Sequence, residues 1–344
     1  MIHRLAQVFS DSNGHVRTKL FGIYGILVAI NVGAWLWALA AFHQHPVLLG
    51  TALLAYSFGL RHAVDADHIA AIDNATRKLM QEHKRPVAVG FFFSLGHSSV
   101  VVLASIGVAL TAAHVEAFKA VGGVIGTSVS AVFLLVIALM NLVILRSIYK
   151  AWRHVREGGA YVDEDVDLLL ADRGFMARIF RPLFRLISRS WHLYPLGFLF
   201  GLGFDTATEI ALLGISATQA AQGLSPWSIM VFPLLFSAGM SLVDTLDGHL
   251  MLGAYGWAYM KPLRKLYYNM SITLVSVVVA VIIGSIEALG LMADQLELKG
   301  DFWGFIGNLN DSFGMLGYII IGIFVASWAA SVLLYRLKGF DRLA

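Results

Sequence analysis

The sequence predicts an all-α polytopic membrane protein, and three observations carry that prediction. Of its 344 residues, 58% are hydrophobic and only 14% are charged, against about 25% charged in globular proteins. The mean hydropathy is +0.73. Several apolar stretches also reach the length of about 20 residues that a helix needs to cross a bilayer. We therefore expect one transmembrane domain over residues 1–344.

Eight such stretches predict eight transmembrane helices. The 33 glycines suit this prediction, because Gly lets membrane helices approach closely. The absence of Cys excludes disulfides and thiolate metal ligands. In chain order, the spans are 20–42, 47–72, 87–113, 121–145, 194–218, 226–252, 270–293 and 314–335.

The distribution of Lys and Arg predicts the orientation of these spans. With eight spans, the terminal segments and the loops after spans 2, 4 and 6 carry 21 cations, including Arg77 and Lys78. The opposite side carries only Lys119 and Lys299. Because cations favour the cytoplasmic side, we expect both termini to be cytoplasmic, in an inner membrane.

The loop at about 150–193 is the only large segment expected outside the bilayer. An acidic run at 163–172 precedes four arginines spaced three or four residues apart, with apolar residues between them. This second part fits an amphipathic helix on the inner leaflet. A solvated linker explains it equally well.

Span 2 carries an unusual density of ionisable residues. A charge at the bilayer centre costs about 2.5–3.5 kcal/mol on insertion scales, so such residues are candidates for function. The run GLRHAVDADHIAAID contains five within eight positions: Arg61, His62, Asp65, Asp67 and His68. In a regular helix Asp67 would point away from Asp65. Either Asp67 faces a neighbouring helix, or the helix is broken there.

Three further spans carry polar clusters at a similar expected depth. Span 3 has His97 followed by Ser98, span 5 has Asp205 and Glu209, and span 6 has Asp244 and Asp247. Each acidic pair is spaced to share one helix face. The four clusters are therefore expected to form one site.

Imidazole and carboxylate without thiolate suit borderline divalent ions such as Ni²⁺, Co²⁺ or Zn²⁺. Simpler readings exist: His97 could hydrogen-bond across a helix interface, and either acidic pair could neutralise Arg61. Asp73, beside Arg77, is expected at the surface, and Glu287 near the outer end of span 7. The five ionisable residues of span 2 are too many to be explained by packing alone.

Four motifs resemble the nickel/cobalt transporter (NiCoT) family. RHAVDADHI contains the family's HX4DH element, and LGHSSVV, LGFDTATE and GMSLVDTLDG match its other signatures in order. The resemblance implies eight helices with cytoplasmic ends. It also implies metal-site residues, with Ni²⁺ or Co²⁺ as transported substrate and no prosthetic cofactor. The best candidates are His62, Asp65, Asp67, His68 and His97, and the other motif acids have no individual role assigned.

A weak internal echo favours an inverted repeat of spans 1–3 and 4–6. FGLRHAVDADHIA aligns without gaps on FGLGFDTATEIAL 142 residues later, which places Asp67 on Glu209. FSLGHSS aligns on FSAGMSL 143 residues later. Three spans separate the copies, so their orientations in the membrane would be opposite.

Two rival functions remain at this point. A di-iron membrane enzyme needs more histidines than the three inside spans. A related metal exporter often has a His-rich cytoplasmic loop, whereas here the large loop has only His154 and His192, so import is favoured. No Walker motif is present. The expected partners are the metal ion and the lipid bilayer, without an ATPase subunit or nucleic acid. Membrane potential and proton coupling both remain open as driving forces.

Overall fold

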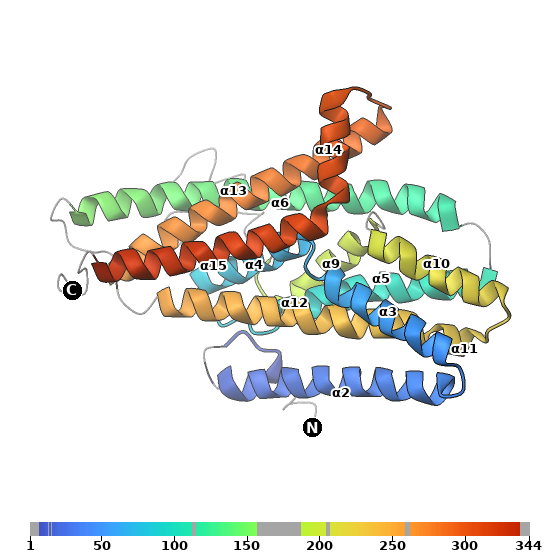
Figure 1. Cartoon of the computed structure of the whole chain (residues 1–344). Coiled ribbons are helices and arrows are strands. Elements are labelled where there is room, and N and C mark those ends of the chain that lie inside the picture. Colours follow the sequence, from blue (N-terminus) through green and yellow to red (C-terminus); the bar gives the residue numbers. More distant parts are fainter. Residues whose placement is uncertain are drawn as a thin grey trace.

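The computed structural model describes residues 7–12, 14, 16–111, 115–156, 187–203, 207–258 and 262–337. In these ranges the regular structure is helical and contains no strand, which confirms the all-α prediction. The longest helices run side by side in one bundle (Figure 1). The described helices are α2 (Val16–Phe42), α3 (Pro46–His62), α4 (Ala66–Gln81), α5 (Val89–Thr111), α6 (Val115–Arg156), η1 (Ser190–His192), α9 (Leu193–Gly201), α10 (Ala207–Ala221), α11 (Pro226–Ile229), α12 (Val231–Ala258), α13 (Pro262–Gln295), α14 (Asp301–Asp311) and α15 (Phe313–Leu337).

The described helices include five to seven candidate membrane spans. Five segments are long and apolar enough by themselves: Val16–Phe42, Val89–Ala109, Gly123–Arg146, Pro226–Tyr255 and Met270–Gln295. Two bent pairs also qualify, α3 with α4 at 51° and α14 with α15 at 72°. The expected fifth span corresponds to α9 and α10, and residues 204–206 between them lie outside the described part.

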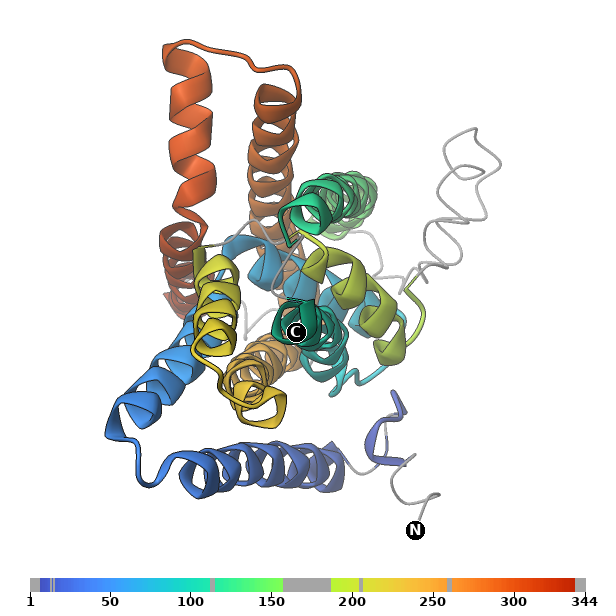
Figure 2. The same ribbon diagram turned by 90° about the vertical axis from the view of Figure 1, so that its right-hand side faces the viewer.

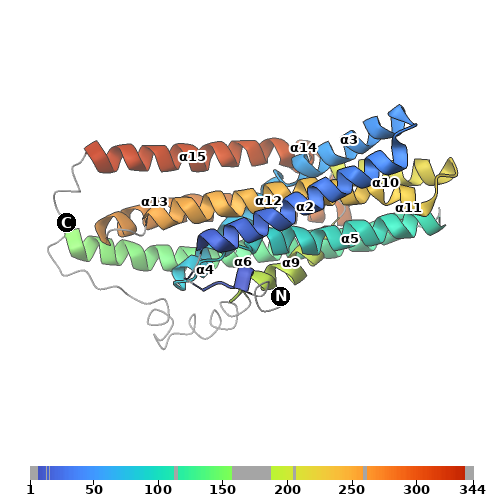
Figure 3. The ribbon, with the colours of Figure 1, turned by 90° about the horizontal axis from the view of Figure 1, so that it is seen from below.

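Helix α4 lies inside the bundle. Apart from Asp67 and Gln81, all of its residues are buried, and it contacts α5, α6, α12, α13 and α15. The end-on view in Figure 2 shows α2 at the rim, where it contacts α3 and α12. Figure 3 shows α15 along one edge of the bundle, with α5 and α9 toward the other.

One part of the orientation argument was wrong in detail. Arg77 and Lys78 were counted as loop cations, but they lie within α4 and are 0% and 3% exposed. The reason is that α4 continues to Gln81, nine residues beyond the expected end of span 2. Without these two residues, the count is still 19 cations against two. The proposed amphipathic segment of the large loop lies mostly outside the described residues.

Close glycine contacts fix the crossings that position the polar residues. A Cβ on Gly59 of α3 would lie 2.0 Å from the carbonyl oxygen of Phe236 in α12. A Cβ on Gly90 of α5 would lie 2.0 Å from the carbonyl oxygen of Asp244, also in α12. Because only Gly permits such an approach, α12 packs closely against both helices that carry site residues.

Candidate metal-binding site

The expected second span is broken where its ionisable residues cluster. Helix α3 ends at His62 and α4 begins at Ala66, with Asp65 in an extended conformation at the junction. The break option is therefore confirmed. It places Asp67 in the first turn of α4, where the helix dipole favours a negative charge.

Three histidines from three helices meet beside this break. The ring centroids of His62, His68 and His97 are separated by 4.6, 4.8 and 4.9 Å. The residues His62, His68 and His97 are 1%, 0% and 2% exposed, respectively. One nitrogen from each lies within 4.8 Å of the others. The predicted convergence of spans 2 and 3 is present in the structure.

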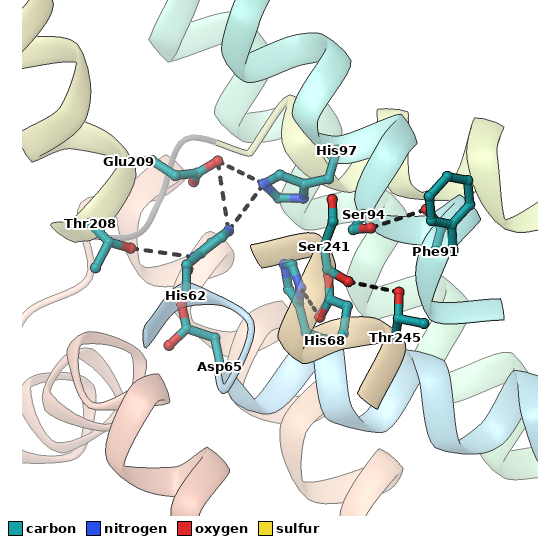
Figure 4. Close-up of polar contacts among 11 residues, drawn as sticks. His62, Asp65, His68, Phe91, Ser94, His97, Thr208, Glu209, Ser241 and Thr245 are labelled. Carbon is teal, nitrogen blue, oxygen red and sulfur yellow. Dashed lines mark hydrogen bonds and ion pairs between the residues drawn. The ribbon is translucent and has the colours of Figure 1, made fainter. Parts of the chain in front are cut away.

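Each histidine has a carboxylate within hydrogen-bond distance (Figure 4). His62 Nδ1 lies 2.8 Å from Asp65 Oδ2, and His97 Nε2 lies 2.8 Å from Glu209 Oε1. His68 Nδ1 lies 3.2 Å from Asp244 Oδ1. A ring N–H that donates to a carboxylate fixes the tautomer and leaves the other nitrogen as a basic ligand, as in many metal sites.

The Nε2 atoms of His62 and His97 and one oxygen of Glu209 lie close together. His62 Nε2 lies 3.0 Å from His97 Nε2 and 3.9 Å from Glu209 Oε1. With the His62 proton on Nδ1, its Nε2 lone pair is directed at this group. His68 Nε2 makes no hydrogen bond to any described residue. A small cation can bind between these rings. Without the cation, His62 and His97 share a proton between their Nε2 atoms.

The other predicted residues differ in how close they come. Asp67 is partly buried and acts electrostatically on His97. Asp247 is buried one turn beyond Asp244 and interacts with it electrostatically. Ser98 is buried, but its hydroxyl bonds to no described residue. Asp205 lies outside the described residues.

In the described part of the chain, the partners found for Glu209 and Asp244 are histidines and not Arg61. The side chain of Arg61 is exposed. Arg61 acts electrostatically on Asp65, and both side chains approach Gly314 at the start of α15. The reading of the acidic pairs as counter-ions of Arg61 is therefore unsupported by the geometry.

Two further acids are buried. Asp73 was expected at the surface but is 0% exposed, and it accepts a hydrogen bond from Tyr255. That expectation was wrong because α4 continues to Gln81 and is enclosed by other helices. Glu287, expected near the outer end of span 7, is 2% exposed and accepts a 2.8 Å hydrogen bond from Ser130.

The aromatic walls of the site were not anticipated. Phe93 packs edge-on to His68, and Phe236 packs against His62. In a chain with 22 Phe residues, no sequence signal separates a phenylalanine of the site from one that faces lipid.

Comparison with known proteins identifies the family. The profile of the NicO family, described as high-affinity nickel-transport protein, matches residues 48–334. This chain belongs to the NicO family. The family members are transporters and not enzymes, which removes the metalloenzyme alternative and confirms the resemblance noted from the motifs.

Several members of the NicO family are similar over nearly the whole chain. The high-affinity nickel transport protein of Cupriavidus necator is 62% identical over 99% of this chain and 98% of its own. The hydrogenase nickel incorporation protein HupN of Bradyrhizobium diazoefficiens is 53% identical over 91% and 83%. The cobalt transport protein NhlF of Rhodococcus rhodochrous is 38% identical over 94% of each chain. No solved structure matches this chain.

Proposed function

We propose that this chain is a secondary transporter that imports Ni²⁺, Co²⁺ or both across the cytoplasmic membrane. The names of its relatives support both ions, and nickel is the more frequent. The single observation that carries the proposal is the buried triad of His62, His68 and His97, with a carboxylate on each ring. The ionised carboxylates need positive charge in a low-dielectric interior, and a dication supplies it.

The spacing of the donor atoms supports such an ion. Two nitrogens 3.0 Å apart can both lie about 2.1 Å from a metal when the ligand–metal–ligand angle is about 90°. Angles of this size belong to square-planar and octahedral coordination. The three candidate ligand atoms lie within 4.8 Å of one another, slightly more than the about 4.2 Å between trans ligands at that bond length, so the rings would close slightly around an ion.

Within this site the residues have different roles. His62, His68 and His97 provide nitrogen ligands. Asp65 and Asp244 orient two of these rings through hydrogen bonds. Glu209 faces both His97 and His62 and supplies negative charge at the ion. Asp67 adds charge, and we assign Arg61, Ser98 and Asp247 to the pathway around the site. Asp205 is assigned to the pathway from its motif alone.

We further infer eight spans built as an inverted repeat, and two matching crossings support this. Gly59 of α3 meets Phe236 of α12, while Gly197 of α9 meets Phe93 of α5. In the same crossings Gly239 meets Tyr56 and Leu60, while Gly96 meets Tyr194 and Phe198. The segments YSFGL (56–60) and YPLGF (194–198) thus pack alike on their partner helices. Sites at the interface of such repeats, beside broken helices, are typical of secondary transporters.

We also propose cytoplasmic termini, on the basis of the cation distribution. The membrane potential then drives entry of the ion. An inside-negative potential of 100 mV favours entry of a dication by about 4.6 kcal/mol. Proton coupling is an addition that the histidines permit.

An uptake assay tests the proposal. Cells expressing the chain should accumulate Ni²⁺, and His68→Ala should abolish this at equal membrane abundance. His249→Gln is the matched control, because His249 is a half-buried histidine that contacts Tyr24 and Val87 instead of the triad. Wild-type uptake by the His62→Ala, His68→Ala and His97→Ala variants would overturn the assignment. Metal loss from preloaded cells, in place of uptake, would favour the exporter reading.

A further inference from the structure

A second buried polar cluster lies beyond the histidine triad. It consists of Asp73 on α4, Asp247 and Tyr255 on α12, and Ser276 on α13. Asp73 and Ser276 are 0% exposed, Tyr255 is 2% exposed and Asp247 is 9% exposed. None of these side chains contacts the histidine rings through a hydrogen bond in the described part of the chain. We call this group the Asp73 cluster.

Several oxygens of the Asp73 cluster are left without hydrogen-bond partners. Tyr255 donates to Asp73 Oδ1, but Asp73 Oδ2 and Asp247 Oδ2 bond to no described residue. Ser276 interacts with both Asp73 and Tyr255, although its hydroxyl meets no described residue with hydrogen-bond geometry. Buried polar oxygens without partners are costly. Two carboxylate oxygens and one hydroxyl from three helices therefore form a group that a cation would stabilise.

The nearby arginine does not fill this role. Arg77, one turn after Asp73, is 0% exposed and donates a 2.8 Å hydrogen bond to Asn74 Oδ1. Its Nε and Nη1 bond to no described residue, and no ion pair joins it to Asp73 within the described ranges. Arg77 still acts electrostatically on Asp73. A structural ion pair therefore does not account for the buried acid.

The Asp73 cluster lies further along α4 and α12 than the residues of the histidine site. Asp73 follows His68 by five residues on α4, a rise of about 7.5 Å, and Asp247 follows Asp244 by three on α12, about 4.5 Å. Asp247 interacts electrostatically with both Asp244 and Asp73. Both helices advance toward the end that the cation distribution assigns to the cytoplasm.

We propose that Asp73, Asp247 and Ser276 form a second cation-binding site, which the metal ion occupies after leaving the histidine triad. This inference rests on the transport function proposed above. An all-oxygen site suits Mn²⁺ or Mg²⁺ and binds Ni²⁺ less tightly than imidazole does. The charge of Arg77 weakens it further, which favours release, since conduction needs sites that an ion can leave.

Metal binding to the full chain in lipid nanodiscs tests the inference. We expect two Ni²⁺ per chain, one tight and one weak. Asp73→Asn and Asp247→Asn should each remove only the weak one. Glu287→Gln is the matched control: it removes another buried carboxylate, 11 residues or about 16 Å along α13 from Ser276, and should leave both sites intact.

Mn²⁺ distinguishes failure of this inference from failure of the proposed function. Its electron paramagnetic resonance spectrum should report a bound ion in the wild type and in His68→Ala, and only free ion in Asp73→Asn. In proteoliposomes Asp73→Asn should lower the maximal Ni²⁺ uptake rate about tenfold with little change in KM. A single Ni²⁺ per chain, or Mn²⁺ binding that survives both acid substitutions, would overturn the second site. Tight Ni²⁺ binding that survives loss of the histidines would overturn the proposed function instead.

Discussion

Replacing Gly90 by Ala should disrupt the metal site from a distance, through the contact between α5 and α12. The new Cβ would lie 2.0 Å from the Asp244 carbonyl oxygen and 2.9 Å from the Thr245 Cα. Both atoms belong to the backbone, so no side-chain rotation relieves the contact. Reaching ordinary contact at 3.4 Å requires the helices to separate by about 1.4 Å.

A separation of this size matters because Asp244 orients His68. Their hydrogen bond is already 3.2 Å long, so even a partial shift takes it beyond useful length. Loss of a carboxylate that orients a ligand typically costs 10–100-fold in metal affinity. We expect a similar loss of Ni²⁺ affinity in Gly90→Ala, and overpacking should cost about 1–3 kcal/mol of stability.

Calorimetric Ni²⁺ titration and thermal unfolding of purified protein measure these two effects. Gly107→Ala is the control on the same helix, because a Cβ there meets nothing within 4 Å. It should keep wild-type affinity and stability. Unchanged affinity in Gly90→Ala would show that the α5–α12 crossing does not position the site, and would refute this reasoning.

Three further predictions concern the site and the topology. Asp65→Ala should weaken Ni²⁺ binding about 10–100-fold, and Asp65→Asn less, because an amide oxygen can still accept from His62 Nδ1. Ni²⁺ titrations that find tighter binding in Asp65→Ala than in Asp65→Asn would contradict this. Ni²⁺ displaces the proton between His62 and His97, so binding should release protons and weaken as the pH is lowered; heats that are independent of buffer ionisation would contradict this. A reporter fused after Ala344 should be active only in a cytoplasmic assay, and periplasmic activity would refute the eight-span count.

The chemistry of the site could be predicted because charges in a bilayer are costly. Five ionisable residues in span 2 have no reason to be there unless they converge on something, and His97 is similarly conspicuous in span 3. The pairing of His68 with Asp244, and of His97 with Glu209, could not be predicted. It depends on the rotation and register of separate helices, about which the residue spacing within one helix carries no information.

The burial of Asp73 was hidden for a different reason. Arg77, Lys78, Lys84 and Arg85 follow it closely, and a cation-rich stretch after an apolar segment is typical of a loop. In the structure Arg77 bonds to Asn74, and Lys78 donates to the Ile187 carbonyl and pairs with Glu82 at 3.1 Å. Cations enclosed within the bundle look the same in sequence as cations in water.

The sequence echo and the helix crossings differ in register by four residues. Crossing contacts relate Tyr56, Gly59 and Leu60 to residues 138 positions later, whereas the echo relates Asp67 to Glu209, 142 positions later. The first register belongs to the helices before the two junctions, α3 and α9, and the second to the helices that follow them, α4 and α10. Each of these following helices carries an acid in its first turn, Asp67 in α4 and Glu209 in α10. A single uninterrupted alignment of the two halves conceals this change of register.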